Sequence, residues 1–310
     1  MGLSRRNFLK SVGTGALGTA LGVKLSYAGL PVAAQATSPA AAFYTTMLGD
    51  FQVTVIRDGV ASIGLDTLAA NADPAEVGDL LADNGFPTGQ QPNNFKQLLV
   101  NTGSDLVLFD TGRGAADSQL LPTLQLIGVE PGDITQVMIT HWHPDHIGGA
   151  VADGAPAFPN ATYYMAQAEW DLLNAPDANQ GLQGALSSLQ PIADGLELYN
   201  DGDEVLAGIT ALAAPGHTPG HHGFVISSGD QTLINTVDAI IHPVISVQRS
   251  DWYFGFDADP DQAVSTRQSL LSRVASENAM LFGYHFPFPG IGYVAAGDEE
   301  NAYRFTPFSY

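Results

Sequence analysis

Three histidines and an aspartate lie within six residues, at His141, His143, Asp145 and His146. The chain has eight histidines in all, so chance does not explain this density. Side chains two residues apart in extended backbone project to the same side, which lets His141 and His143 reach one ion. Pro144 starts a turn, so Asp145 and His146 point elsewhere, toward a second ion. The spacing predicts a metal centre built from imidazole and carboxylate groups.

Three later segments supply single ligands of the same chemical types. His217 lies in the run Gly-His-Thr-Pro-Gly-His, Asp238 ends an apolar run, and His285 follows another. Each stands where a predicted strand passes into a loop, as the first motif does. A rigid sheet commonly presents functional side chains on such loops. We therefore expect all seven residues at one edge of a two-sheet core.

The secondary structure around these residues is predicted to consist mostly of short strands. We predict strands at residues 51–57, 61–65, 97–101, 105–110, 134–140, 204–213, 222–227, 231–237 and 279–284, with two more near the C-terminus. Helices are predicted at residues 118–127, 167–174, 182–192 and 260–278. Gly59 is expected in a turn, residues 71–94 in a loop or short helix, and Asp259 at a helix N-cap. No linker divides residues 37–310, so we predict one α/β domain with two sheets.

The N-terminus has the features of an export signal. Arg5 and Arg6 form a twin-arginine pair before a weakly apolar run that is too short for a membrane helix. Small residues offer cleavage after Ala28 or Ala36. We therefore expect residues 1–36 to be a twin-arginine signal peptide. The mature protein would be periplasmic or secreted, with no stable membrane anchor after cleavage.

The composition narrows the range of partners and ligands. The formal net charge is −21, from 32 acidic residues against 11 Lys and Arg. A surface this acidic repels phosphodiester backbones, so we expect no nucleic-acid partner, although it also suits a solubility or salt adaptation. It weighs against polyanionic substrates unless a local positive site, such as two divalent ions, overrides it. The chain has no cysteine, which excludes disulfides and thiolate ligands.

The order of these motifs resembles the metallo-β-lactamase superfamily. His-x-His-x-Asp-His at residues 141–146 is followed by Gly-His-Thr-Pro-Gly-His at 216–221, then by a lone Asp238 and a lone His285. Residues 109–112, Phe-Asp-Thr-Gly, are similar to its early Asp-bearing motif. The resemblance implies an αββα sandwich, in which two mixed β-sheets are flanked by helices. The methyl parathion hydrolase-like branch is the most similar, through residues 98–108, 140–149, 285–292 and 303–305.

The resemblance implies two metal ions that share one ligand. The implied ligands are His141, His143 and His217 for the first ion, Asp145, His146 and His285 for the second, and Asp238 for both. His221 would orient neighbouring groups, and Asp110 would support the structure around them. Zinc is the expected metal, with manganese, iron or cobalt as alternatives. The resemblance also implies a homodimer.

An aromatic substrate pocket is expected, as in the resembled branch. The candidate lining residues are Trp142, Trp252, Phe254, His242 and Phe288. Trp142 could equally pack beneath the site. For the aromatic run 252–256 the pocket wall is favoured, with a dimer contact as the alternative. We expect His242 to be a pocket or hydrogen-bonded histidine and not a metal ligand.

The chemistry that this centre suggests is hydrolysis. Two ions can share one water, lower its pKa toward neutrality and provide a bridging hydroxide that attacks carbon or phosphorus. Asp145 and Asp238 are the expected catalytic carboxylates, and Asp145 would accept or relay the proton. An apolar pocket favours a small neutral ester over a polyanion. The expected substrates are phosphotriesters such as methyl parathion, lactones and aryl esters.

Three alternatives stay open. The first is a quorum-quenching acyl-homoserine lactonase, although dedicated members of that group carry Tyr where this chain has Ile241. The second, from another class, is a mononuclear-iron persulfide dioxygenase, which would bind one iron per chain and consume oxygen. The third is a metal-binding protein without catalysis. The bridging Asp238 argues against β-lactam hydrolysis, because dizinc β-lactamases generally lack it.

Overall fold

The computed structural model describes residues 41–297 and 301–308, which belong to one compact unit. The predicted signal peptide, residues 1–36, lies outside the described residues. Within the described part of the chain, no helix combines the length and the apolar character that a membrane crossing requires.

Seven strands form the first sheet, in the order β1-β2-β3-β4-β5-β8-β9. They are β1 (Phe43–Leu48), β2 (Phe51–Ile63), β3 (Gln91–Asn101), β4 (Leu106–Phe109), β5 (Gln136–Ile139), β8 (Thr162–Ala166) and β9 (Leu196–Tyr199). The pairs from β1 to β4 are antiparallel, and those from β4 to β9 are parallel. The sheet is therefore mixed, and β4 and β5 end at the same edge.

Seven later strands form the second sheet, in sequence order from β10 to β16. They are β10 (Glu204–Leu206), β11 (Ile209–Ala213), β12 (His222–Ser228), β13 (Gln231–Asn235), β14 (Met280–Phe282), β15 (Ile291–Ala296) and β16 (Tyr303–Pro307). Only β13 and β14 pair in parallel among these described strands. A separate small hairpin joins β6 (Val151–Ala152) and β7 (Ala155–Pro156).

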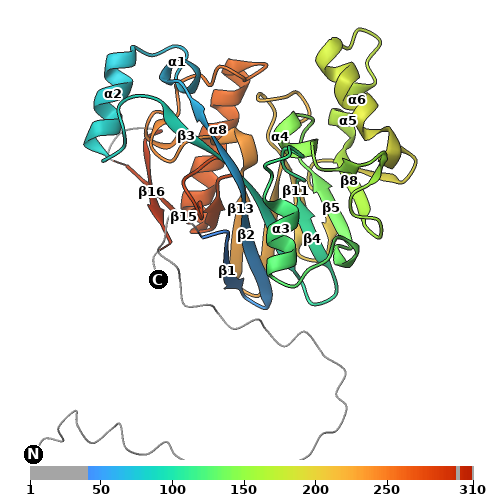
Figure 1. Cartoon of the computed structure of the whole chain (residues 1–310). Helices are drawn as coiled ribbons and strands as arrows, with labels where there is room; N and C mark the ends of the chain where they lie inside the picture. The colour runs from blue at the N-terminus through green and yellow to red at the C-terminus, as the bar shows by residue number, and fades with distance from the viewer. Residues whose placement is uncertain (1–40, 298–300, 309–310) are drawn as a thin grey trace, which may run out of the picture. The chain divides into compact units, whose positions relative to one another are not determined.

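Helices cover the outer faces of both sheets. They are α1 (Leu65–Leu68), α2 (Pro74–Asp83), α3 (Leu120–Leu126), α4 (Pro144–Ile147), α5 (Gln167–Leu173), α6 (Gln180–Ala193), α7 (Ile245–Gln248) and α8 (Pro260–Glu277), with short 3₁₀ turns at Pro131–Asp133 and Val237–Ala239. Residues of α3 and α6 pack on the first sheet, and α8 packs on the second. Figure 1 shows α5 and α6 beside β8, with α8 next to β15 in the other half of the sandwich.

Successive residues of the central strands face different cores. Val107 and Phe109 of β4 lie in the core between the two sheets, whereas Leu108 lies in the core under α3 and α6. In β5, Met138 faces the inter-sheet core and Val137 faces the helices. This period of two residues is what a strand covered on both faces requires. The expected αββα sandwich with two mixed sheets is confirmed.

One predicted turn is wrong. Gly59 is not in a turn, because β2 continues through it from Phe51 to Ile63. The register of β2 against β3 shifts between Arg57 and Gly59, which marks a β-bulge. Residues 91–94, expected in a loop, also belong to a strand, since β3 begins at Gln91. A glycine signals a break in regular pairing, but only the partner strand decides between a turn and a bulge.

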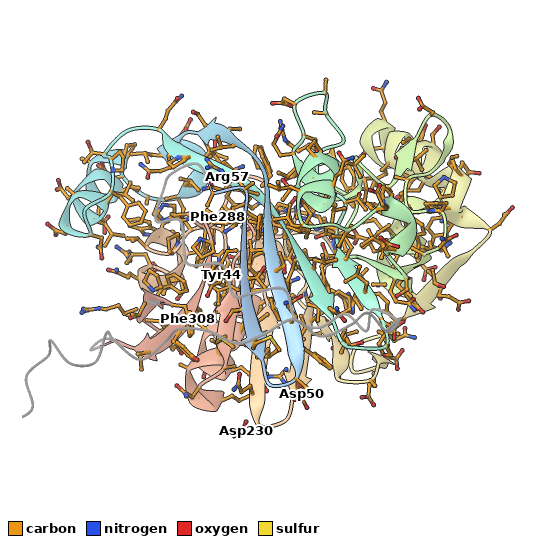
Figure 2. All side chains as sticks on the ribbon, turned by 60° about the horizontal axis from the view of Figure 1, so that its bottom comes forward. Tyr44, Asp50, Arg57, Asp230, Phe288 and Phe308 are labelled. Atoms are coloured by element: carbon orange, nitrogen blue, oxygen red, sulfur yellow. The ribbon has the colours of Figure 1, made fainter. Side chains whose placement is uncertain are left out.

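The turns at the edge opposite to the metal motifs fasten the two sheets together. The Asp50 amide donates to Ser228 Oγ at 2.9 Å, and the Gly49 amide donates to Gln231 Oε1 at 3.1 Å. A Cβ on Gly49 would lie 2.3 Å from the Ser228 carbonyl oxygen, so only glycine permits this approach. Figure 2 shows Asp50 and Asp230, which lie in these two turns, at the same end of the molecule.

Gly216, beside the predicted ligand His217, makes a second close approach. It has φ of +127°, and a Cβ there would lie 2.3 Å from the Ala263 amide nitrogen in α8. Gly216→Ala should lower the free energy of unfolding by about 2–4 kcal/mol, because it adds backbone strain and a clash. Gly229→Ala is the matched control, since its φ is +62° and no atom lies within 4 Å of the new Cβ. Urea unfolding that gave equal losses would contradict this packing.

Candidate metal centre

Five strands end at one edge of the sandwich, and each is followed by residues of the predicted centre. Asp110 follows β4, residues 140–146 follow β5, residues 214–221 follow β11, Asp238 follows β13, and His285 follows β14. These strands run in the same sense within each sheet, which is why their loops meet. The structure brings all seven ligand candidates together at this edge, as predicted.

The first motif folds into a loop and one helical turn. His143 occupies the N-cap of α4 with extended backbone, and Pro144 takes the first helical position, where its missing N–H costs nothing. His141 and His143 therefore precede the helix, whereas Asp145 and His146 lie within it. Gly148 follows, and a Cβ there would lie 2.2 Å from the Arg113 carbonyl oxygen. The glycine lets the β4–α3 loop pass against the motif.

His141, His143, His217 and Asp238 form the first cluster, with ligand atoms that all lie within 4.8 Å of one another. His143 Nδ1 is 3.1 Å from His141 Nε2 and 2.9 Å from His217 Nε2. Asp238 Oδ2 is 3.2 Å from His217 Nε2. Three imidazole nitrogens and one carboxylate oxygen thus converge, which is a donor set that suits a divalent transition metal.

Asp145, His146 and His285 form the second cluster, also within 4.8 Å. Asp145 Oδ2 is 3.6 Å from His146 Nε2 and 3.7 Å from His285 Nε2. Asp238 reaches this cluster too, because its Oδ1 is 3.4 Å from His146 Nε2 and its Oδ2 is 3.2 Å from His285 Nε2. Asp238 is therefore the carboxylate that lies between the two clusters.

Two buried atoms of this centre have no hydrogen-bond partner in the structure, His146 Nε2 and Asp238 Oδ1. A buried polar atom left without a partner costs about 1–3 kcal/mol. Both atoms face the shared space between the clusters, where coordination to an ion would satisfy them. The residues present therefore fit two divalent ions, and the fit uses only nitrogen and oxygen donors.

His146, His217 and His285 are oriented by hydrogen bonds at the nitrogen that faces away from the centre. The partners are Asp110 Oδ2 for His146 Nδ1 at 2.8 Å, Asp257 Oδ1 for His217 Nδ1 at 3.0 Å, and the Asn94 carbonyl for His285 Nδ1 at 2.8 Å. His221 donates from Nδ1 to the Ala214 carbonyl, and its Nε2 accepts from the Asp238 amide. Such bonds select the tautomer that presents the other nitrogen.

Charges inside the centre distribute its protons unevenly. Burial alone would lower the pKa of His217, but hydrogen bonds to Asp238 and Asp257 outweigh it and raise that pKa to about 9. Burial lowers the pKa of His143 to about 4, with help from the neighbouring His217. Burial would raise the pKa of Asp145, yet the charge of His146 brings it down to about 2. Without metal, protons lie on imidazoles next to carboxylates.

Asp257 and Arg267 support the first cluster, and no sequence motif marks either residue. Both side chains are buried. Arg267 donates from Nε to the Ala239 carbonyl at 3.0 Å, from Nη1 to the Trp252 carbonyl at 2.7 Å, and from Nη2 to Asp257 Oδ2 at 3.3 Å. It thereby ties α8 to the residue after Asp238 and to the partner of His217. A lone Asp after an aromatic run carries no motif, so only the fold identifies it.

Asp257→Asn should weaken binding of the first ion by about 10- to 100-fold, because the amide no longer fixes the His217 ring as the carboxylate does. The measurement is competition for zinc against a chelator, at a temperature where the variant is folded. Asp251→Asn is the control, since Asp251 pairs with Arg249 at the surface. Wild-type affinity in Asp257→Asn would show that this carboxylate does not orient the ligand.

Glu169 of α5 joins the two histidine-bearing loops. Its Oε1 accepts from the Trp142 amide at 2.9 Å, and its Oε2 accepts from Thr218 Oγ1 at 2.8 Å. The Gly220 amide donates to it as well. Burial raises the pKa of Glu169 to about 7, although these hydrogen bonds oppose the shift. The carboxyl group therefore holds the two loops together, and its contribution to the free energy of unfolding depends on pH.

The pH dependence of stability should report on Glu169. The unfolded chain loses this proton near the ordinary pKa of 4.5, whereas the folded protein keeps it up to about 7. Stability attributable to Glu169 therefore falls as pH rises through that window, by about 3 kcal/mol. Glu169→Gln removes the titration, so its free energy of unfolding relative to wild type should rise by that amount between pH 4.5 and 7.5.

Urea unfolding of the metal-free proteins at several pH values measures this difference. Glu197→Gln, at an exposed position of β9, is the matched control. A constant gap between Glu169→Gln and wild type across the whole range would contradict the prediction.

A cavity of about 530 Å³ opens onto the centre. Its lining residues are Asn93, Phe95, Arg113, Ala115, His143, Pro144, Asp145, His217, Asp238, Phe254, Phe256 and His285. Phe254, expected in the pocket, stacks on His217 with ring centroids 5.8 Å apart. Phe256 meets Phe254 edge to face and is 62% exposed at the side of the cavity. The cavity is thus aromatic on one side and bears metal-ligand candidates on the other.

Two tryptophans expected in the pocket do not line the cavity. Trp142 packs on the helical side of the first sheet, within 3.5 Å of a Cβ placed on Gly181 in α6. Of the two positions expected for Trp142, the structure therefore has the one beneath the site and not the one in the pocket wall. Trp252 is buried in a separate cluster with α1 and α2, and the Arg249 guanidinium lies 4.3 Å from its ring centroid. The aromatic run 252–256 therefore divides, and only its later members reach the cavity.

His242 and Phe288 also lie outside the lining. His242 is buried, and its Nδ1 accepts from the Val244 and Ile245 amides at 3.2 Å, so it stabilises the start of α7. Phe288 packs against the inter-sheet core, on the side of the sandwich where Figure 2 places Tyr44. The lining residues that were missed include Asn93, which was expected in a loop, and Phe95, because the strand was expected to begin only at residue 97.

The family of this chain follows from its similarity to known proteins. The family model of the metallo-beta-lactamase superfamily matches residues 97–285, which is more than half of the chain. The chain therefore belongs to the metallo-β-lactamase superfamily. The methyl parathion hydrolase-like branch stays a prediction.

Two solved structures share the fold over most of their length. AidC, a dizinc quorum-quenching lactonase solved with the product N-hexanoyl-L-homoserine, is 30% identical. The alignment covers 88% of this chain and 99% of AidC, with a TM-score of 0.81. The hydrolase AbOPH of the beta lactamase superfamily is 25% identical, with 87% and 98% covered and a TM-score of 0.79.

Curated relatives match a shorter segment. An atrochrysone carboxyl ACP thioesterase from Cryptosporiopsis sp. is 31% identical over 169 residues, which are 50% of this chain and 45% of the relative. An N-acyl homoserine lactonase from Azorhizobium caulinodans is 28% identical over 138 residues, or 40% and 48%. The matched segment thus spans about half the length of these curated relatives.

Proposed function

We propose that the protein is a dinuclear metal-dependent hydrolase that cleaves a carboxylic ester bond in a small substrate, with lactones as the first candidates. The observation that carries this proposal is Asp238, which lies between two complete imidazole–carboxylate clusters on the wall of a partly aromatic cavity. The similarity to AidC over 88% of the chain supports the choice of lactones. The similarity to thioesterases supports acyl transfer to water more generally.

The residues present would divide the reaction between them. Two divalent ions bound at the clusters would supply a polarised substrate carbonyl and a water of lowered pKa. Asp145 lines the cavity with its carboxylate partly exposed. Its Oδ2 faces His146 and His285 as a ligand atom, so its other oxygen would receive a proton and return it to the leaving oxygen. Phe254 and Phe256 would hold the apolar part of the substrate and exclude water.

His143→Ala and Asp238→Ala should each lose bound metal and lower turnover by at least about a hundredfold, because ion binding supplies several kcal/mol of transition-state stabilisation. Metal analysis and hydrolysis assays on the full chain measure both effects. The panel comprises N-hexanoyl-homoserine lactone, an aryl ester, an acyl thioester, methyl parathion and nitrocefin. Asp230→Asn is the control, since that carboxylate lies in the turn at the opposite end (Figure 2).

The outcomes separate the candidate functions. Two ions per chain with lactone or aryl ester turnover support the proposal, and turnover of methyl parathion alone would point to a phosphotriesterase instead. One iron per chain, no hydrolysis and oxygen uptake with a persulfide would replace the hydrolase by a dioxygenase. Full turnover by either site variant would refute the site assignment.

A further inference from the structure

Arg113 is a cavity-lining residue that the metal centre does not use. It stands on the β4–α3 loop, and among the residues that line the cavity it has the side chain with a permanent positive charge. The chain as a whole carries a charge of −21. The positive charge of this guanidinium faces the same cavity as the metal-ligand clusters. Its sign is therefore opposite to the net charge of the protein.

The backbone around Arg113 is shaped to hold the guanidinium at this position. The bulge in β2 places Gly59 beneath it, and a Cβ on Gly59 would lie 2.6 Å from Arg113 Nη2. The Arg113 amide donates to Asp58 Oδ2 at 3.2 Å. Gly114 has φ of +58° and packs on the Gly148 backbone, where a Cβ would lie 2.0 Å from the carbonyl oxygen. The loop is thus locked against the first metal motif.

The side chain keeps hydrogen-bonding capacity for a ligand. Its guanidinium lies 4.9 Å from the ring centroid of Phe95, another lining residue. Nε is buried and has no hydrogen-bond partner in the structure. Nη2 pairs with Asp117 at 3.0 Å, but the Asp117 side chain is 77% exposed, and such surface pairs contribute little. A guanidinium has five donors in a planar fork, so most of them remain for a ligand.

We propose that Arg113 is a specificity-determining residue that binds a planar oxygen acceptor of the substrate, an amide carbonyl or a carboxylate. This inference rests on the proposed function, because it assigns the substrate class of the same site. A planar fork suits carboxylate and amide oxygens, and the Phe95 ring packs against it with its centroid 4.9 Å from the guanidinium carbon. Phe254 and Phe256 take the hydrocarbon part. Substrates are therefore esters that carry such an acceptor at a distance from the bond that is cleaved.

Matched substrate pairs test this assignment. N-hexanoyl-homoserine lactone, which has an amide, is compared with a five-membered lactone bearing a plain alkyl chain. Mono-4-nitrophenyl glutarate, which has a carboxylate, is compared with 4-nitrophenyl valerate. Arg113→Met removes the fork and keeps the apolar stem, whereas Asp117→Asn removes the exposed ion pair and keeps the guanidinium. Arg113→Lys keeps the charge without the planar fork.

Arg113→Met should lose about 10- to 100-fold in kcat/KM on the acceptor-bearing member of a pair and less than about threefold on the plain member. Arg113→Lys should show a smaller loss with the same selectivity, and Asp117→Asn should show none. The pair with the larger selective loss identifies the acceptor as amide or carboxylate. Equal losses on both members of each pair, or no loss on either, would overturn the inference.

A binding measurement separates this inference from the proposed function. N-hexanoylglycinamide offers the amide acceptors but no ester, so calorimetry can follow its binding without turnover. Affinity for wild type about tenfold higher than for Arg113→Met supports the inference. Equal affinities, or no binding to wild type, would count against it. A wild-type protein that holds two ions, binds N-hexanoylglycinamide more tightly than Arg113→Met does, and hydrolyses none of the four ester substrates would refute the proposed function alone.

Discussion

A buried carboxylate surrounded by imidazoles explains how the sheets and loops of this protein are arranged. Asp238 is almost fully buried, and its oxygens lie within 3.4 Å of His146, His217 and His285. Burial of an ionised carboxylate is costly unless opposite charges or an ion surround it. Five strands of the two sheets end at the same edge. The loops that follow them come from both halves of the chain and enclose this carboxylate.

Further buried carboxyl groups hold those loops in place. Asp110 fixes the His146 ring, Asp257 fixes the His217 ring, and Glu169 joins the loops that carry His141 and His217. Each of the three comes from a different element, and Arg267 compensates Asp257 in the interior. The geometry of the centre is therefore a property of the surrounding protein and not of its ligand residues alone.

The sequence was informative where chemistry or local geometry repeats a pattern. All seven ligand candidates come together, and α8 lies between the N-cap Asp259 and the C-cap Asn278, as its capping residues predict. Asp257, Glu169 and Arg113 could not be found in this way, because their roles come from contacts with residues far away in the chain. The pocket was only partly predicted for the same reason. Trp252 and Phe254 are two residues apart, yet only Phe254 reaches the cavity.

The bonds at the outward nitrogens of the histidines have a consequence for how ions enter and leave. His146, His217 and His285 have their rings oriented by the protein before any ion arrives, through Asp110, Asp257 and the Asn94 carbonyl. Little rearrangement is then needed on binding, and little of the binding free energy is spent on folding. We expect this protein to exchange one divalent ion for another while it stays folded. The identity of the bound metal would then depend more on which divalent ions are available around the protein than on the selectivity of the site.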